Sequence, residues 1–145
     1  MIGGIRDTMT ELSEKNKYYI SKHRYYELLH FCRQYMDFLA MKEQILAACV
    51  RPVIANHTIT TDVMASHRTD HMERWAIKLS EVDDKIQLIE ETAVDADKEL
   101  SDYILMAVTS GLGYDTLNAR YNVPCARNTF YDRYRKFFWL LDQRR

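Results

Sequence analysis

Residues 70–94 read DHMERWAIKLSEVDDKIQLIEETAV, and apolar side chains recur in this stretch at alternating spacings of three and four residues. This spacing is the a/d pattern of three heptads, which predicts one long amphipathic helix with a single apolar seam. Asp70 and Glu73 can form a capping box, so we expect the helix to begin there and to end near Val94. The seam consists of Met72, Trp75, Leu79, Val82, Ile86 and Ile89.

A second helical pattern precedes the seam, over residues 22–50. Ser21 can cap this helix, and a shift in the phase of its apolar residues predicts a bend between Tyr35 and Asp37. Pro52 should end the helix, because a residue before proline disfavours helical backbone angles. Residues 52–67 are then a loop, and residues 1–20 are a flexible N-terminal arm.

The seam has two possible partners. In one interpretation the helix at 70–94 packs antiparallel on the helix at 22–50, so that residues 21–95 form a helical hairpin. In the other it pairs with a second copy of the chain as a coiled coil, and both could hold in a bundle of four helices.

Composition favours a single broad fold class. The chain has 145 residues, of which 47% are hydrophobic and 28% charged, and only 4 Gly and 2 Pro, a scarcity of turn residues that argues against an all-β fold. We therefore expect an all-α protein. No apolar run is long enough to span a bilayer, no signal peptide is recognisable, and the three cysteines are widely spaced, which together predict a cytoplasmic protein with reduced thiols.

Residues 96–145 have the pattern of a helix-turn-helix module. Gly111 and Asn122 suit the left-handed ends of two helices, with a short helix between them from Asp115 to Tyr121 that turns Leu117 and Tyr121 inward. Val123 is the apolar residue of the turn, and Pro124 lies near the start of the next helix, where its missing N–H costs little. This recognition helix follows at about 126–143, its exact start left open between residues 126 and 128.

The polar face of that helix has the chemistry of a DNA-reading surface. Arginine can donate two hydrogen bonds to guanine, asparagine can pair with adenine, and basic residues behind them can hold phosphates. The candidate DNA-binding residues are Arg120, Arg127, Asn128, Thr129, Tyr131, Arg133, Arg135 and Lys136.

Charge is distributed unevenly along the chain. Residues 70–102 hold 11 acidic and 4 basic residues, a net charge of −7, whereas residues 103–145 hold 7 basic and 3 acidic residues, a net charge of +4. A basic end is expected where a protein meets phosphate, so only the C-terminal end should face double-stranded DNA.

Patterns for catalysis and metal binding are weak. His67 and His71 are four residues apart, but no Cys-x-x-Cys or His-Glu-x-x-His motif accompanies them. The adjacent pairs Asp83-Asp84 and Glu90-Glu91 diverge around a helix, and Cys125 has no histidine near it in sequence. We expect no catalytic residues, no metal and no cofactor, and the protein is not expected to be an enzyme.

Several stretches resemble a known group of proteins. They are RYYELLHFCRQY at 24–35, LIEETA at 88–93, VTSGLGY at 108–114, VPC at 123–125 and FYDRYRKFF at 130–138. The chain resembles small phage and prophage proteins of the RinA/ArpU type, late transcription regulators whose C-terminal module is similar to sigma factor region 4. The resemblance implies a phage-encoded or prophage-encoded DNA-binding regulator and supplies no catalytic residues.

Three functions stay open at this point. The first is a DNA-binding transcriptional regulator, which could act as a homodimer and could contact a host protein such as RNA polymerase. The second is a protein–protein interaction module that inhibits or adapts host machinery, for example an anti-CRISPR-type inhibitor. The third is a packaging protein similar to a small terminase, which would assemble into a ring.

Overall fold

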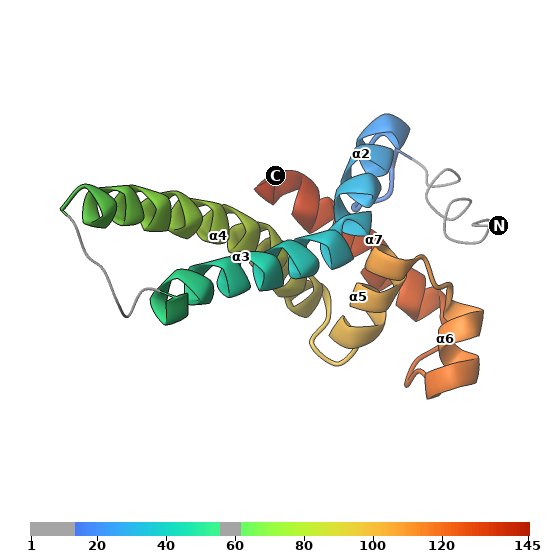
Figure 1. Cartoon of the computed structure of the whole chain (residues 1–145). Helices are drawn as coiled ribbons and strands as arrows, with labels where there is room; N and C mark the ends of the chain where they lie inside the picture. The colour runs from blue at the N-terminus through green and yellow to red at the C-terminus, as the bar shows by residue number, and fades with distance from the viewer. Residues whose placement is uncertain (1–13, 56–61) are drawn as a thin grey trace. The chain divides into compact units, whose positions relative to one another are not determined.

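The computed structural model describes the backbone of residues 14–55 and 62–145, and the side chains of residues 14–49 and 70–145. All regular secondary structure in these ranges is helical, which confirms the all-α class (Figure 1). The helices are α2 (Lys22–Arg33), α3 (Tyr35–Ala55), α4 (Asp62–Ala96), α5 (Ser101–Ser110), α6 (Tyr114–Tyr121) and α7 (Arg127–Arg144). None of these helices is both long enough and apolar enough to cross a membrane.

The chain divides into two compact units. One is made of residues from Met1–Tyr35 and Gln87–Arg145, and the other is Met36–Ile86. Because α2 packs against α5 and α7, it belongs with the C-terminal helices. The sequence pattern places it in the hairpin, and this part of the predicted division is wrong, because the apolar stripe of 22–33 packs on α5 and α7, far along the chain.

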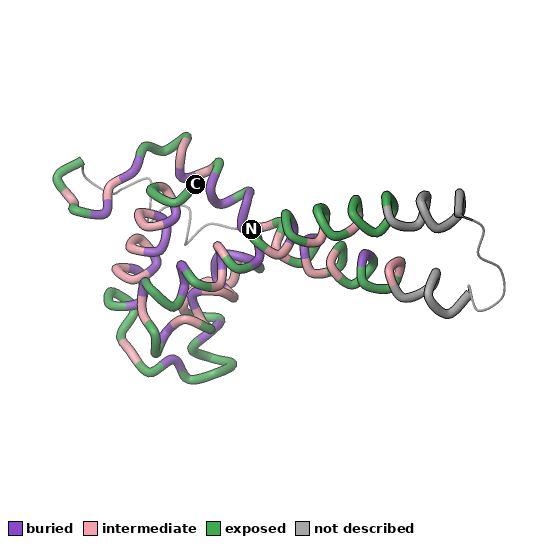
Figure 2. The backbone as a smooth tube through the Cα atoms, turned by 90° about the vertical axis from the view of Figure 1, so that its left-hand side faces the viewer, coloured by how far each residue is buried: buried purple, intermediate pink, exposed green. Residues whose placement is uncertain are grey.

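The second unit is an antiparallel pair formed by α3 and α4, which lie side by side in both views (Figures 1 and 2). Lys42 Nζ lies 2.7 Å from Asp83 Oδ1, and the Lys85 ammonium sits 5.4 Å from the centre of the Phe38 ring. Val82 is buried between the helices with only 4% of its surface exposed. Within one chain, the seam therefore packs against the preceding helix, as the intramolecular interpretation predicts.

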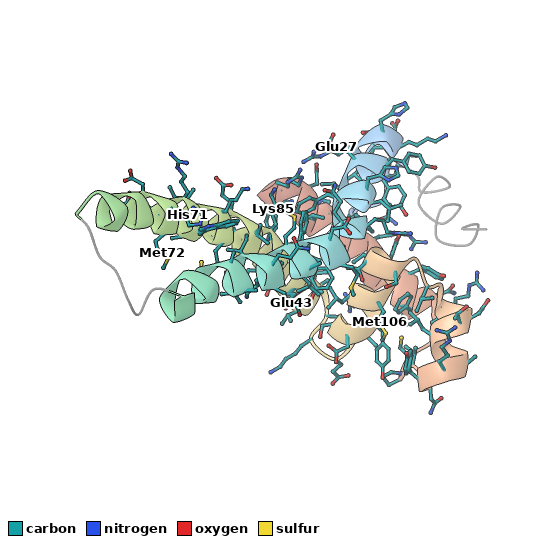
Figure 3. All side chains as sticks on the ribbon, in the orientation of Figure 1. Glu27, Glu43, His71, Met72, Lys85 and Met106 are labelled. Atoms are coloured by element: carbon teal, nitrogen blue, oxygen red, sulfur yellow. The ribbon has the colours of Figure 1, made fainter. Side chains whose placement is uncertain are left out.

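Burial along the seam is graded. Val82, Ile86 and Ile89 are buried, Trp75 and Leu79 are half-buried, and Met72, nearer the start of α4, is 41% exposed (Figure 3). The apolar contact is therefore closest toward the C-terminal part of α4.

The predicted ends of the two long helices are wrong in detail. The predicted helix over 22–50 is interrupted at Gln34, next to the predicted bend between Tyr35 and Asp37, whereas α3 continues through Pro52 to Ala55 and α4 begins at Asp62 instead of Asp70. α3 can pass Pro52 because a proline inside a helix costs about 3 kcal/mol but does not forbid the helix. α4 can begin before Asp70 because residues 62–69 contain no Gly or Pro to interrupt helical hydrogen bonding. Residues 56–61 of the predicted 52–67 loop lie outside the described residues.

The described end of the N-terminal arm is packed. Tyr18 and Ile20 are buried, and the Tyr18 ring lies 5.7 Å from that of Trp139 on α7. A flexible arm over the whole of 1–20 is therefore wrong for these residues, whose apolar side chains cover part of α7, while residues 1–13 lie outside the described part.

The core of the first unit is built around α7. Its fully buried side chains are Phe130, Tyr134, Phe137, Phe138 and Leu141. The ring of Tyr25 on α2 meets Phe138 edge-on at 4.9 Å between centroids, and the Tyr25 and Tyr134 hydroxyls are 2.8 Å apart. Aromatic pairs in this edge-to-face geometry add to the free energy gained from burial. The helix expected to read DNA is thus also the central helix of this core.

Left-handed residues end the helices before α6 and α7. Gly111 terminates α5 with φ 76°, and Asn122 terminates α6 with φ 54°, both as the sequence predicts. These turns let the chain reverse direction within a few residues, which sets the spacing of α5, α6 and α7.

Candidate nucleic-acid interface

Helices α6 and α7 are joined by residues 122–126 and held by a small set of contacts. Leu117 and Val123 are buried, as predicted for the inner side of α6 and for the turn. The Tyr114 backbone N–H donates to the Tyr131 hydroxyl at 3.1 Å, and the Tyr114 hydroxyl donates to the Cys125 carbonyl at 2.6 Å. These bonds tie the start of α6 to both the turn and α7, so the connection is rigidly supported.

Four of the predicted DNA-binding residues are exposed at this connection. Arg127, Asn128 and Thr129 form the first turn of α7, and Arg120 lies in the last turn of α6. Ala126, which caps α7, offers no side-chain acceptor to the first backbone N–H groups of the helix. Those N–H groups and the positive end of the helix dipole are then available to an anion.

Tyr131 is not part of the exposed face, so its place among the predicted DNA-binding residues is wrong. The side chain is 5% exposed, and its hydroxyl accepts the hydrogen bond from Tyr114. α7 packs against α2, α5 and α6, so its buried arc is wider than the single apolar stripe assumed from the sequence.

Arg133 is engaged within the chain. Its Nε lies 3.4 Å from Asp97 Oδ2, and the other oxygen of Asp97 accepts the backbone N–H groups of Glu99 and Leu100 ahead of α5. Arg133 therefore ties α7 to the connection between α4 and α5. This pair, together with a second one from Nη1 to Asp132 Oδ2 at 3.6 Å, competes with the predicted DNA contact of Arg133, which stays a prediction.

Arg135 and Lys136 are half-buried on α7. The Nε of Arg135 is buried without a hydrogen-bond partner, which leaves only the outer part of its guanidinium for a ligand. Lys136 makes no ion pair with the described residues, so its ammonium can serve as a phosphate contact.

Arg127 has a partner that it can exchange. Its Nη1 lies 3.0 Å from Asp115 Oδ2, with side chains 53% and 78% exposed, and its guanidinium lies 5.6 Å from the centre of the Tyr131 ring. An exposed pair of this kind contributes about 0–1 kcal/mol. A phosphate or a guanine edge can therefore replace Asp115 at small cost.

Tyr121 belongs to the exposed surface, although the sequence pattern predicts it to point inward. It is 49% exposed. It lies four residues after the buried Leu117, so helical spacing alone places it inside, but α6 ends at this residue and no later turn covers it. The missed signal is the helix end marked by Asn122.

Part of the basic charge of the C-terminal segment is neutralised within the protein. Besides the Arg133 pair, Arg144 Nη2 lies 2.6 Å from Asp95 Oδ2, and Arg144 also donates to the buried Thr92 hydroxyl at 3.1 Å. The acidic end of α4 therefore serves as a counter-charge for α7, and the cations left for a ligand lie mainly near the turn.

Other chemistry finds little support in the described residues. No group of three or more His, Cys, Asp or Glu side chains among them could hold a metal ion, and the side chain of His67 is outside them. Burial, with a smaller contribution from Asp97, raises the pKa of the Cys125 thiol, which disfavours the thiolate form that a nucleophile needs.

Comparison of the chain with protein-family models, with curated proteins and with solved structures finds no match. The resemblance to the RinA/ArpU group and the assignment of α6 and α7 as a DNA-binding helix-turn-helix therefore stay predictions.

Proposed function

We propose that the protein binds double-stranded DNA through the α6–α7 face, which we define as Arg120, Tyr121, Arg127, Asn128 and Thr129. The observation that carries this proposal is the first turn of α7, where Arg127, Asn128 and Thr129 are exposed. The aromatic side chains that follow them on the same helix, beginning with Phe130, are buried in the core. A rigid helix with an exposed polar N-terminal turn is what major-groove recognition requires.

The chemistry of the face divides into two roles. Arg127 and Asn128 are suited to guanine and adenine edges, because a guanidinium and a carboxamide each make paired hydrogen bonds to those bases. Arg120 and Lys136 would contact phosphates and fix the position of α7 along the groove. The uncapped first turn of α7 supports a further phosphate contact through its backbone N–H groups.

The biological role that fits this activity is transcriptional regulation. The resemblance to phage and prophage regulators supports a phage-encoded or prophage-encoded protein that acts in the cytoplasm and contacts the host RNA polymerase. A homodimer would read two half-sites related by its own symmetry.

Fluorescence anisotropy with duplexes from the gene's own neighbourhood tests the proposal. The paired substitution Arg127→Ala with Asn128→Ala should weaken specific binding by at least about 30-fold, because two base contacts worth about 1–3 kcal/mol each are lost together. Lys22→Ala is the matched control: it removes an exposed charge from the first turn of α2, which contacts the opposite end of α7 through the Arg24–Asp142 pair, and should leave affinity unchanged. The proposed face would be refuted if DNA affinity did not fall as the salt concentration rises, or if the paired substitution left the affinity unchanged.

The same preparations separate the alternatives. A stable complex with a host protein, together with no salt-dependent DNA binding, would favour an inhibitor of host machinery such as an anti-CRISPR-type protein. A ring of many subunits in light scattering would favour a packaging protein.

A further inference from the structure

The outer side of α4 carries an ordered row of exposed residues. Asp70, Arg74, Ile77, Glu81 and Lys85 follow one another at spacings of three or four residues, which places them along one side of the helix. We call this row the α4 stripe. It is distinct from the seam that packs on α3, and His71 and Lys85 indicate its extent along the helix (Figure 3).

The stripe presents apolar surface as well as charge. Ile77 is 61% exposed, although it lies near the middle of the row. An open hollow of about 410 Å³ lies beside it and is lined by His71, Arg74, Trp75, Ile77 and Lys78. The exposed Ile77 and the half-buried Trp75 supply the apolar part of this hollow, which a partner could cover.

The charges on the stripe have a symmetric order. The row has a midpoint between Ile77 and Lys78. Arg74 and Glu81 each lie roughly 5 Å from this midpoint along the helix axis, on opposite sides of it. Asp70 and Lys85 each lie roughly 11 Å from it, again on opposite sides. Each equidistant pair has opposite sign. A two-fold axis at this midpoint would therefore bring Arg74 to Glu81 of a second copy and Asp70 to Lys85 of that copy.

We propose that a second copy of the chain docks antiparallel along the α4 stripe and forms a symmetric dimer. The two Ile77 side chains would meet at the axis, flanked on each side by the Arg74–Glu81 contacts. Among the residues that the structure describes, Asp70, Arg74 and Glu81 make no ion pair, so the Arg74–Glu81 contacts would break none. The Lys85 ammonium lies 5.4 Å from the centre of the Phe38 ring on α3, so its contact with Asp70 of the second copy would compete with that packing.

The self-complementary charge order of the α4 stripe favours a second copy of the chain over other partners. An interface related by a two-fold axis must pair each residue with the symmetric position on the other copy, and the stripe meets that condition with opposite charges. A nucleic acid would be repelled by Asp70 and Glu81 as strongly as it is attracted by Arg74 and Lys85. Since one helix face over residues 70–85 is small for a protein interface, we expect a dissociation constant in the micromolar range.

The test is the mass of the full chain by sedimentation equilibrium from roughly 1 to 200 μM, without DNA, so that its result is independent of the proposed DNA binding. Arg74→Glu and Glu81→Arg, made singly, each place two like-charge contacts in the dimer and should weaken it at least ten-fold. The two changes combined restore opposite charges and should return the dissociation constant to near that of the original chain. Residues 74 and 81 are two turns apart, so no direct pair within one helix can explain the rescue.

Glu73→Arg is the matched control, because it reverses an exposed charge on α4 outside the stripe and should leave the dimer intact. Ile77→Glu should abolish dimerisation, whereas Val94→Glu, at a residue 46% exposed on the same helix, should not. Circular dichroism checks that each variant remains helical. A chain that is monomeric up to 200 μM, or a dimer that the single reversals leave unchanged or the double reversal fails to restore, would overturn the proposal.

Discussion

The hydroxyl pair between Tyr25 and Tyr134 gives a quantitative test of the core of the first unit. The two oxygens are 2.8 Å apart, and the side chains are 1% and 0% exposed. Tyr134→Phe removes one oxygen and leaves the Tyr25 hydroxyl buried without its partner. Because a buried unsatisfied hydroxyl costs about 1–3 kcal/mol, we expect the free energy of unfolding to fall by that amount, and Tyr25→Phe should have a similar effect.

The double variant is the informative one. With both hydroxyls gone, nothing polar remains unpaired, and two phenylalanine rings keep the edge-to-face contacts around Phe138. We therefore expect the double variant to lose less stability than the sum of the two single variants, with a coupling of about 1–2 kcal/mol.

Urea denaturation followed by circular dichroism measures all four proteins of this cycle. Tyr121→Phe is the control, since this side chain is 49% exposed and its loss should change stability by less than about 0.5 kcal/mol. Additive losses in the double variant would show that the two hydroxyls do not bond to each other, and the account of this core would then be wrong.

Two further predictions concern the same unit. Burial raises the pKa of Tyr25 to about 12, so the folded state keeps this hydroxyl neutral while the unfolded chain ionises near pH 10. Stability should be full below pH 10 and fall between pH 10 and 12, with Tyr25 contributing up to roughly 1.4 kcal/mol per pH unit and the raised pKa values of Tyr134 and Tyr35 adding to the fall. Urea midpoints measure it, and a midpoint unchanged over this range would contradict it. Gly111→Ala should destabilise by about 1–2 kcal/mol, because φ is 76° and an added Cβ would lie 2.6 Å from Arg33 Nη1. In Gly113→Ala the added Cβ would meet only the Tyr131 hydroxyl, at 3.5 Å, so this variant should lose less stability than Gly111→Ala. Thermal melts of the two variants compare them, and an equal loss of stability would contradict the steric argument.

The long helices show what local sequence patterns determine. The a/d spacing from Met72 to Ile89 predicts the helix and its packing on the preceding helix, because burying a stripe of that period requires a neighbouring helix. The start of α4 was missed by eight residues, since a capping motif at Asp70 is only a local preference worth about 1 kcal/mol. The helical hydrogen bonds formed over residues 62–69 outweigh the preference of Asp70 for the first position of the helix.

The candidate interface shows where local patterns fail. A helical pattern divides the residues of a helix between one buried face and one exposed face. α7 packs against three helices, so its buried face is wider than the pattern assumes and includes Tyr131. The pair between Arg133 and Asp97 joins residues 36 positions apart, and no periodicity in either segment encodes it. The exposed first turn of α7 was predictable because it depends only on the turn at Asn122 and the start of the helix.

These internal pairs set how strongly DNA binding should depend on salt. Arg133 and Arg144 are held by carboxylates of the acidic segment, and Arg127 by an exchangeable one, so one copy offers Arg120, Lys136 and Arg127 for phosphates or bases. Since each neutralised phosphate contributes about −0.9 to the slope of log K against log salt concentration, one copy should give a slope of roughly −2 to −3 and a dimer roughly twice that. Anisotropy titrations between 50 and 300 mM salt measure it. A slope well beyond −6 would mean that cations outside the α6–α7 face and Lys136 dominate the contact, because the cations counted here cannot release that many counterions.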